Sequence, residues 1–265
     1  MTIIDTHAHL DHIENLDEAL SNAAGAGVEA IVTVSVNAAS CRKNLEIKKS
    51  KRQPKIHLAM GMHPSDADPA QVGECVELIR AHKSDLAAIG EIGLDFWYKW
   101  ARRDREKKDA QRRVFRMLLE TAKEMELPAI VHTRGTWREC LDTVKGVGLT
   151  KAEFHWYSGP IDVLKDILDG GYYISAAPSL AYSPQSREAI RYAPVDRTMI
   201  ETDSPVYYHV PSEAGASGEN GGFVAEPRDV FRTLKAYCAL KNLDEESTLA
   251  ILNRNAREFF GLAGR

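Results

Sequence analysis

The sequence predicts an α/β fold, a (β/α)8 TIM barrel with C-terminal helices, formed as a single domain by residues 1–265. Short apolar runs alternate with longer amphipathic stretches, and this alternation repeats eight times along the chain. The length of 265 residues fits one closed barrel, and we find no linker that would divide it. The alternative is an open doubly wound sheet. It is weakened because no GxGxxG motif follows the first apolar run.

The eight apolar runs are the expected strands. They cover residues 3–5, 30–36, 56–62, 86–94, 128–133, 151–157, 172–178 and 197–203. A helical stretch is expected after each run, and a strict alternation of strand and helix is typical of parallel pairing. We therefore expect one sheet in which all eight strands are parallel.

The stretches between the runs have the spacing of amphipathic helices. In residues 16–27, Leu16, Leu20 and Ala24 fall on one face, and glycines end the segment. The later expected helices cover residues 41–50, 69–82, a long segment that ends at 126, 137–146, 161–170 and 184–193. After a Gly/Ser-rich stretch at 209–223, which predicts a mobile loop, residues 226–242 and 244–262 predict two helices that complete the barrel or extend beyond it.

The composition is that of an ordinary globular protein, with 44% hydrophobic and 27% charged residues. The net charge is −4, so contact with nucleic acid would require a local basic patch. Cys41, Cys75, Cys140 and Cys238 lie far apart without a CxxC motif, which predicts reduced thiols. The sequence has no signal-peptide pattern and no run of about 18 apolar residues, so we expect a cytoplasmic protein without membrane contact.

Several polar side chains interrupt the apolar runs, and each lies at or near the end of an expected strand. They are His7, His9, His63, Glu91, His132, His155 and Asp203. In a barrel the C-terminal ends of the strands meet at one face, where active sites lie. Histidines scattered through a core would not all choose that end, so we expect these side chains to converge in one mouth.

Imidazoles and carboxylates gathered in one mouth favour a divalent metal site. In the opening stretch IIDTHAHLDH, His7 and His9 stand two apart on an extended chain, so both point the same way and can reach one ion. Glu91 lies among apolar residues and needs a partner or an altered pKa. Taken singly, the histidines could be structural and Asp203 could cap a helix. Six ligands, with His63 left out, are too many for one zinc ion and indicate two ions with one shared carboxylate.

Six motifs resemble, in order and spacing, those of the TatD family of metal-dependent hydrolases in the amidohydrolase superfamily. The motifs are DTHAHLD, GMHP, IGEIGLDF, PAIVHTR, FHWYSG and IETDSP, and the likeness extends from residue 3 to the tail ILNRNAREFFGL. The resemblance implies two divalent metal ions per chain, such as zinc, magnesium or manganese. It implies that one ion is held by His7, His9 and Asp203, and the other by His132 and His155, with Glu91 as the bridge.

The resemblance also implies roles beyond metal binding. His63 would be a histidine that contacts the substrate phosphate without holding a metal, and Arg134 would be a phosphate clamp. Metal binding lowers the pKa of bound water to about 7, and Asp203 would orient that water and accept its proton. Catalytic roles are therefore expected for Asp203, His63 and Glu91. Ser204 has no free histidine to activate it, which disfavours covalent catalysis.

Two departures from the family pattern concern the substrate. The usual HCFSG is HWYSG here, and the rings of Trp156 and Tyr157 would narrow the mouth or stack on a base. A basic run at residues 102–113 follows the aromatic residues Trp97, Tyr98 and Trp100. We interpret this run either as a phosphate-binding rim or as a solvated helix face with i, i+4 ion pairs.

The function expected first is hydrolysis of phosphodiesters in DNA, as single strands or ends, by a water that two metals activate. The alternative is an amidohydrolase-type enzyme that cleaves a small amide, ester or lactone with the same metals. A third possibility is a metal-stabilised nucleic-acid-binding protein without turnover. A complete ligand set beside an unused base argues against this third function.

Overall fold

The computed structural model describes residues 2–209 and 221–262. In these residues eight parallel strands form one sheet in sequence order. They are β1 (Ile3–Ala8), β2 (Val28–Thr33), β3 (Lys55–Met60), β4 (Leu86–Asp95), β5 (Ala129–Arg134), β6 (Ala152–Phe154), β7 (Tyr173–Ala176) and β8 (Thr198–Ile200). The predicted barrel is confirmed.

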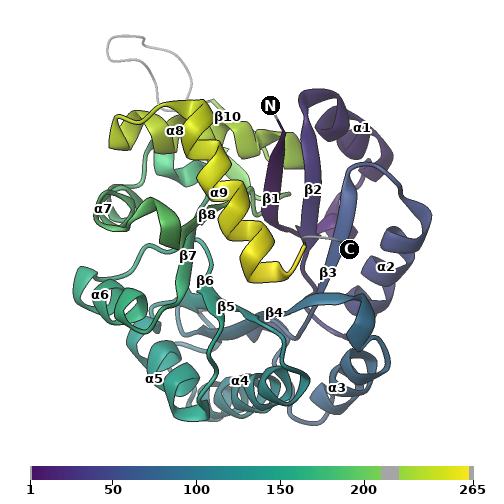
Figure 1. The fold of residues 1–265 in the computed structure, drawn as a ribbon. Helices are drawn as coiled ribbons and strands as arrows, with labels where there is room; N and C mark the ends of the chain where they lie inside the picture. The colour runs from purple at the N-terminus through teal and green to yellow at the C-terminus, as the bar shows by residue number, and fades with distance from the viewer. Residues whose placement is uncertain (1, 210–220, 263–265) are drawn as a thin grey trace.

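The helices lie outside the ring of strands except for the last, which crosses one end of the ring, as Figure 1 shows. They are α1 (Leu16–Ala26), α2 (Ala38–Ser50), α3 (Val72–Ala81), α4 (Arg105–Met125), α5 (Trp137–Val147), α6 (Ile161–Asp169), α7 (Pro184–Tyr192), α8 (Val230–Lys241) and α9 (Glu245–Phe260). The last two are the predicted C-terminal helices. An antiparallel pair, β9 (Tyr207–His209) and β10 (Gly222–Val224), was not predicted and takes up both ends of the expected loop. The rest of that loop, residues 210–220, lies outside the described residues.

The strands β6 and β8 are much shorter than the apolar pattern predicted. β6 ends at Phe154 and β8 ends at Ile200, whereas the pattern continued to residues 157 and 203. Shortly after these strand ends, Trp156 and Asp203 adopt left-handed conformations, with φ of 42° and 50°. No regular strand contains such a residue. Both left-handed residues lie at the mouth of the barrel, where they turn the chain across the strand ends.

The helix α9 closes the opposite end of the barrel. Asn253 accepts a hydrogen bond from the backbone N of Ile4 at 3.1 Å, and Asn255 donates to the backbone O of Thr198 at 2.8 Å. Ile4 and Thr198 stand near the N-terminal ends of β1 and β8, so α9 lies across that end (Figure 1, yellow). Phe259 and Phe260 pack there against the apolar side chains that fill the barrel. This leaves the C-terminal end open for a site.

The barrel closes between β8 and β1 through few contacts. Ala8 and Ser204 form an isolated parallel bridge. The buried carboxylate of Asp5 accepts hydrogen bonds from the backbone N and the hydroxyl of Thr202, at 2.9 and 2.6 Å. These contacts hold the ends of the first and last strands side by side.

The four cysteines are buried free thiols, in agreement with the prediction from their spacing. Among residues 2–209 and 221–262, no helix combines the length and the apolar character needed to cross a bilayer.

Candidate metal centre

The structure brings the predicted site residues together at the C-terminal mouth of the barrel. A cavity of about 720 Å³ opens there. Its lining includes His9, His63, Glu91, His132, Arg134, His155 and Asp203. His7 lies buried below them, and its ring stacks on that of His155 at 4.1 Å between centroids. The polar residues at the strand ends therefore lie together at one end of the barrel, as we expected.

The strands fix the positions of these side chains. His7, Glu91 and His132 are residues of β1, β4 and β5, whose backbones are held in the sheet ladder. His155 directly follows β6. Asp203 lies three residues beyond β8, and its backbone N donates to the O of His7 at 2.9 Å. Aspartate tolerates the left-handed conformation better than most residues, so the turn can direct this carboxylate into the mouth.

One group of possible metal-ligand atoms surrounds the carboxylate of Asp203. The Nε2 atoms of His7 and His9 lie 3.4 and 3.2 Å from its Oδ1. Both nitrogens also lie 3.4 Å from Oε2 of Glu91. Within the described residues, His7 Nε2 and Asp203 Oδ1 are buried without a hydrogen-bond partner. Buried polar atoms normally have partners, and a cation among these four groups would supply one.

A second group surrounds the other oxygen of Glu91. Oε1 lies 2.7 Å from His132 Nδ1 and 2.7 Å from His155 Nε2, and these two nitrogens are 3.3 Å apart. Glu91 is only 2% exposed. Burial would raise its pKa, but the surrounding histidines lower it well below the ordinary value, so the group is an ionised carboxylate. Its two oxygens are thus divided between two sets of imidazoles, an arrangement that fits a bridge between two cations.

His63 stands beside the second group. Its Nε2 lies 3.7 Å from Oε1 of Glu91, and its Nδ1 accepts a hydrogen bond from the backbone N of Ser65 at 3.0 Å. Because Nδ1 is the acceptor, the proton of the neutral ring is on Nε2 and faces the mouth. Burial lowers the pKa of His63 to about 3, so the ring is neutral. With Glu91 and His132, however, it also forms a group whose ligand atoms lie within 4.8 Å of one another, so metal binding by His63 is the geometric alternative.

Arg134 lies at the rim of the cavity as the last residue of β5. Its Nε donates to Oδ2 of Asp95 at 2.7 Å, and its guanidinium lies 4.8 Å from the centre of the Tyr98 ring. The side chain is 45% exposed, so a ligand in the mouth can reach it.

The sequence did not single out two buried carboxylates that contact the histidines. Asp95 Oδ2 lies 3.1 Å from Nε2 of His132, and Glu201 Oε1 lies 3.3 Å from Nδ1 of His155. Each touches the ring nitrogen that faces away from Glu91. For Asp95 a signal was present, because it lies an even number of residues from Glu91 on one extended strand, and even spacing there places side chains on one face.

The aromatic residues near the site divide between the mouth and the core. Trp156 lines the cavity, and its Nε1 donates to the hydroxyl of Ser179 at 2.7 Å. Trp97 also lines the cavity and is 62% exposed. Tyr157 is buried in the main core and donates its hydroxyl to Pro160 O at 2.8 Å. The expectation that the Tyr157 ring narrows the mouth is therefore wrong.

The basic run at residues 102–113 also divides. Arg112 pairs with Asp109 at 2.8 Å and with Glu139 at 2.5 Å, as expected for an ion-paired helix face. Arg102 lies exposed in the turn before α4, and its backbone N donates to the O of Tyr98, which lines the mouth. The beginning of the run thus lies near the cavity, whereas Arg112 belongs to the outer surface.

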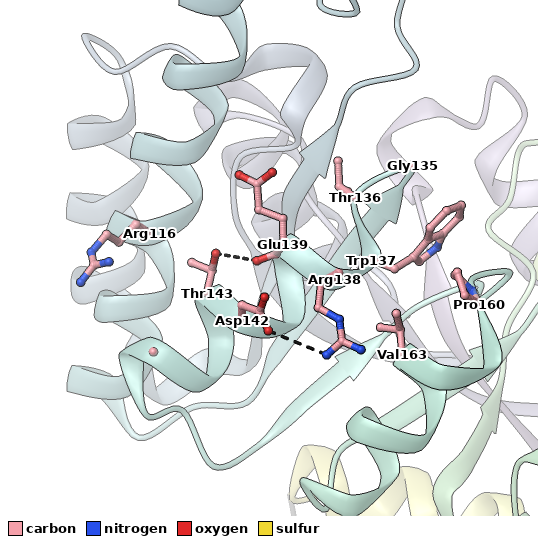
Figure 2. Close-up of a pocket in the computed structure, with 11 residues that line it drawn as sticks. Arg116, Gly135, Thr136, Trp137, Arg138, Glu139, Asp142, Thr143, Pro160 and Val163 are labelled. Carbon is pink, nitrogen blue, oxygen red and sulfur yellow. Dashed lines mark hydrogen bonds and ion pairs between the residues drawn. The ribbon is translucent and has the colours of Figure 1, made fainter.

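A second hollow, of about 600 Å³, lies on the outer surface over α5 and the beginning of α6 (Figure 2). Arg138 in its lining pairs with Asp166 at 2.6 Å and lies 4.0 Å from Asp142. The described residues that line it include none of those predicted for the site. Its charges satisfy one another, so we place the chemistry in the mouth.

The fold and the polar mouth define a barrel hydrolase of the metal-dependent class. The family model described as TatD related DNase matches residues 4–261, so the chain belongs to this family of metal-dependent hydrolases. The resemblance of the six motifs is thereby confirmed.

Similar proteins agree with this classification. The putative deoxyribonuclease tatdn3 of Danio rerio is 30% identical, over 97% of this chain and 96% of that protein. The human deoxyribonuclease TATDN3 is 28% identical, over 97% and 94%. The solved structure of YjjV, a TatD homolog from Escherichia coli, superimposes with a TM-score of 0.84 at 22% identity over 98% of both chains. That structure supports the fold.

Proposed function

We propose that this protein hydrolyses phosphodiester bonds in DNA with the help of two divalent cations held in the mouth. The observation that carries the proposal is the position of Glu91, whose two oxygens face two separate groups of ligand atoms. The names of the relatives support DNA as the substrate, because both are called deoxyribonucleases.

Each of the two groups of ligand atoms would hold one ion. One ion would be held by His7, His9 and Asp203, the other by His132 and His155, with Glu91 shared between them. Zinc, manganese and magnesium are the ions we propose to test, since imidazole with carboxylate is compatible with several divalent metals. When bound, such cations supply Lewis-acid activation of water and of phosphoryl oxygens.

The protein groups of the mouth would position and neutralise the phosphate. The Nε2–H of His63 and the guanidinium of Arg134 are donors at the cavity, and charge-assisted hydrogen bonds to phosphoryl oxygens strengthen as negative charge develops there. Burial opposes ionisation of Asp203, but the close approach of His9 Nε2, at 3.2 Å, and the nearby histidines lower its pKa below the ordinary value. It is therefore a carboxylate able to orient a water molecule and to accept its proton.

The aromatic residues around the mouth favour unpaired bases. Trp97 and Trp100 are 62% and 44% exposed, and the rings of Tyr98 and Trp100 stack with centroids 5.3 Å apart. Stacking on such rings requires bases that are not already stacked in a duplex. Single strands and duplex ends are therefore the proposed forms of the substrate.

The test is an assay of metal-reconstituted protein on single-stranded DNA, duplex DNA and a panel of lactones and amides. We expect metal-dependent cleavage of DNA with preference for single strands or ends, and loss of cleavage in metal-free protein. Turnover of a lactone or amide without cleavage of DNA would favour the amidohydrolase alternative. Tight DNA binding without turnover of any substrate would favour the non-catalytic alternative.

A further inference from the structure

Asp95 holds three parts of the mouth with one buried carboxylate. Its Oδ2 lies 3.1 Å from Nε2 of His132 and accepts a hydrogen bond from Nε of Arg134 at 2.7 Å. Its Oδ1 accepts from the backbone N of Trp97 at 2.9 Å. The residue is 0% exposed, and its backbone is fixed in turn by Gln111 of α4, whose side chain bonds both its N and its O, at 2.9 and 3.1 Å.

Arg134 Nε and Trp97 N can only donate, so both oxygens of Asp95 act as hydrogen-bond acceptors. The contact at 3.1 Å between Oδ2 and Nε2 of His132 is then a hydrogen bond when the proton of the His132 ring is on Nε2. The lone pair is then on Nδ1, which faces Glu91 and His155 at the proposed second ion.

We propose that Asp95 is a positioning residue that couples metal binding to phosphate binding, by holding His132 and Arg134 on one carboxylate oxygen. This inference rests on the proposed function, since it gives His132 to an ion and Arg134 to a phosphate. It follows that removing the carboxylate of Asp95 should weaken both metal binding and phosphate binding. If Asp95 only filled space in the core, its substitution would lower stability without a specific loss of metal or phosphate binding.

Glu201 provides the matched comparison. It is a second fully buried carboxylate, and its Oε1 lies 3.3 Å from Nδ1 of His155. Its Oε2 accepts from the hydroxyl of Ser175 at 2.6 Å. These contacts lead to a proposed metal ligand and not to Arg134. Changing Glu201 should therefore affect the metal alone.

The experiment compares Asp95→Asn, Glu201→Gln and Arg134→Gln in the full chain. Asparagine has the shape of aspartate but one oxygen, so in either orientation its NH₂ faces one of the donors. Mn²⁺ affinity is measured by calorimetry, and the affinity for inorganic phosphate is measured at Mn²⁺ concentrations that saturate each variant. Circular dichroism establishes that each variant is folded.

We expect Asp95→Asn to weaken Mn²⁺ binding by about 10-fold or more, as is usual when a carboxylate behind a metal-binding histidine is lost. It should also weaken phosphate binding about as much as Arg134→Gln does. Glu201→Gln should weaken Mn²⁺ binding only, and Arg134→Gln should weaken phosphate binding only. In Asp95→Asn combined with Arg134→Gln, the loss of phosphate affinity should be smaller than the sum of the single losses, because both changes remove the same contact.

Two results would overturn the inference. One is an Asp95→Asn variant that loses thermal stability while both affinities stay unchanged. The other is a loss of Mn²⁺ affinity with phosphate affinity unchanged, which would leave Asp95 as a support of His132 alone. Failure of the wild-type protein to bind Mn²⁺ would instead count against the proposed function, so the two failures are distinct.

Discussion

Glu91 is a buried carboxylate whose oxygens face two sets of imidazoles, so its charge is the feature to change first. Glu91→Gln keeps the shape of the side chain but removes the negative charge that two cations would share. We expect fewer divalent ions per chain by elemental analysis and no hydrolysis, with an unchanged circular dichroism spectrum. Unchanged metal content in this variant would contradict the two-ion proposal.

A variant of His63 tests whether this side chain contacts the substrate phosphate or binds a metal ion. If its Nε2–H donates to the phosphate, His63→Ala should retain both ions and lose phosphodiester hydrolysis on the order of 100-fold, as when one donor to a developing oxyanion is removed. His82→Ala is the control, because His82 follows α3 near Asp85, away from the mouth residues. Loss of an ion from His63→Ala would make His63 a ligand.

At the scale of elements, the arginines in the turn before α4 and at its first residue test whether the basic run at residues 102–113 is a phosphate-binding rim. Replacing Arg102, Arg103 and Arg105 with Ala should weaken binding to single-stranded DNA. It should also reduce the slope of log K against log salt by about 2, at roughly 0.7 per phosphate contact. Hydrolysis of a nitrophenyl phosphodiester should hardly change, since this small substrate does not extend to the turn.

The matched control removes three exposed arginines whose ion pairs lie elsewhere: Arg80, Arg116 and Arg254. It changes the net charge equally. If both triple variants lose the same DNA affinity, the effect is one of overall charge, and the rim interpretation fails.

The closing helix α9 is joined to β2 by an ion pair between Arg257 and Glu29. Partial burial raises the pKa of Glu29, but hydrogen bonds from Thr2 and Arg257 lower it below the ordinary 4.5. A lowered folded-state pKa means that the pair stabilises the protein above the unfolded-state pKa and loses its contribution as the pH falls through the folded-state pKa. At pH 7, Glu29→Gln should therefore lower the free energy of unfolding by only about 0.5 kcal/mol, since the pair is partly exposed and solvent screens it.

Chemical denaturation at several pH values checks this prediction. The deficit of Glu29→Gln should disappear as the pH falls well below 4.5, because the wild-type carboxyl is then protonated too. Glu258→Gln is the control, since Glu258 is exposed and lies 3.9 Å from Arg254. A deficit for Glu29→Gln that persists at low pH would show that the lost contact is not ionic.

At the scale of the whole molecule, we propose that the chain folds as a single domain. The strands β1 and β8 are neighbours in one barrel, and α9 packs on side chains from several strands, so the described residues of both ends of the chain share the barrel core. We expect one thermal transition, and a Tm that rises with Mn²⁺ concentration because the ion binds the folded state. Two resolved transitions in calorimetry, only one of them sensitive to Mn²⁺, would contradict a single unit.

The sequence predicted the barrel because strand–helix alternation and chain length both depend on local pattern. It could not predict where β6 and β8 end, since the left-handed turns at Trp156 and Asp203 leave no mark in the apolar pattern. The site residues at strand ends were predictable for the same local reason. The spacing from Glu91 could have placed Asp95 on the same face of its strand, but not its contacts with His132 and Arg134, which depend on the register between β4 and β5.

The junction between β8 and β1 has one further consequence. His7 and His9 stand on one side of it and Asp203 on the other, so an ion held by all three would link the first strand to the last. Such an ion would complete a ring of bonds around the circumference of the barrel. Without it, the ring depends on the backbone bonds between residues 7–9 and residues 203–204 and on the side-chain bonds of Asp5 and Thr6. Local opening of the metal-free barrel would therefore begin at this junction, and the loss of the ion would loosen the protein at the same place where it disables the site.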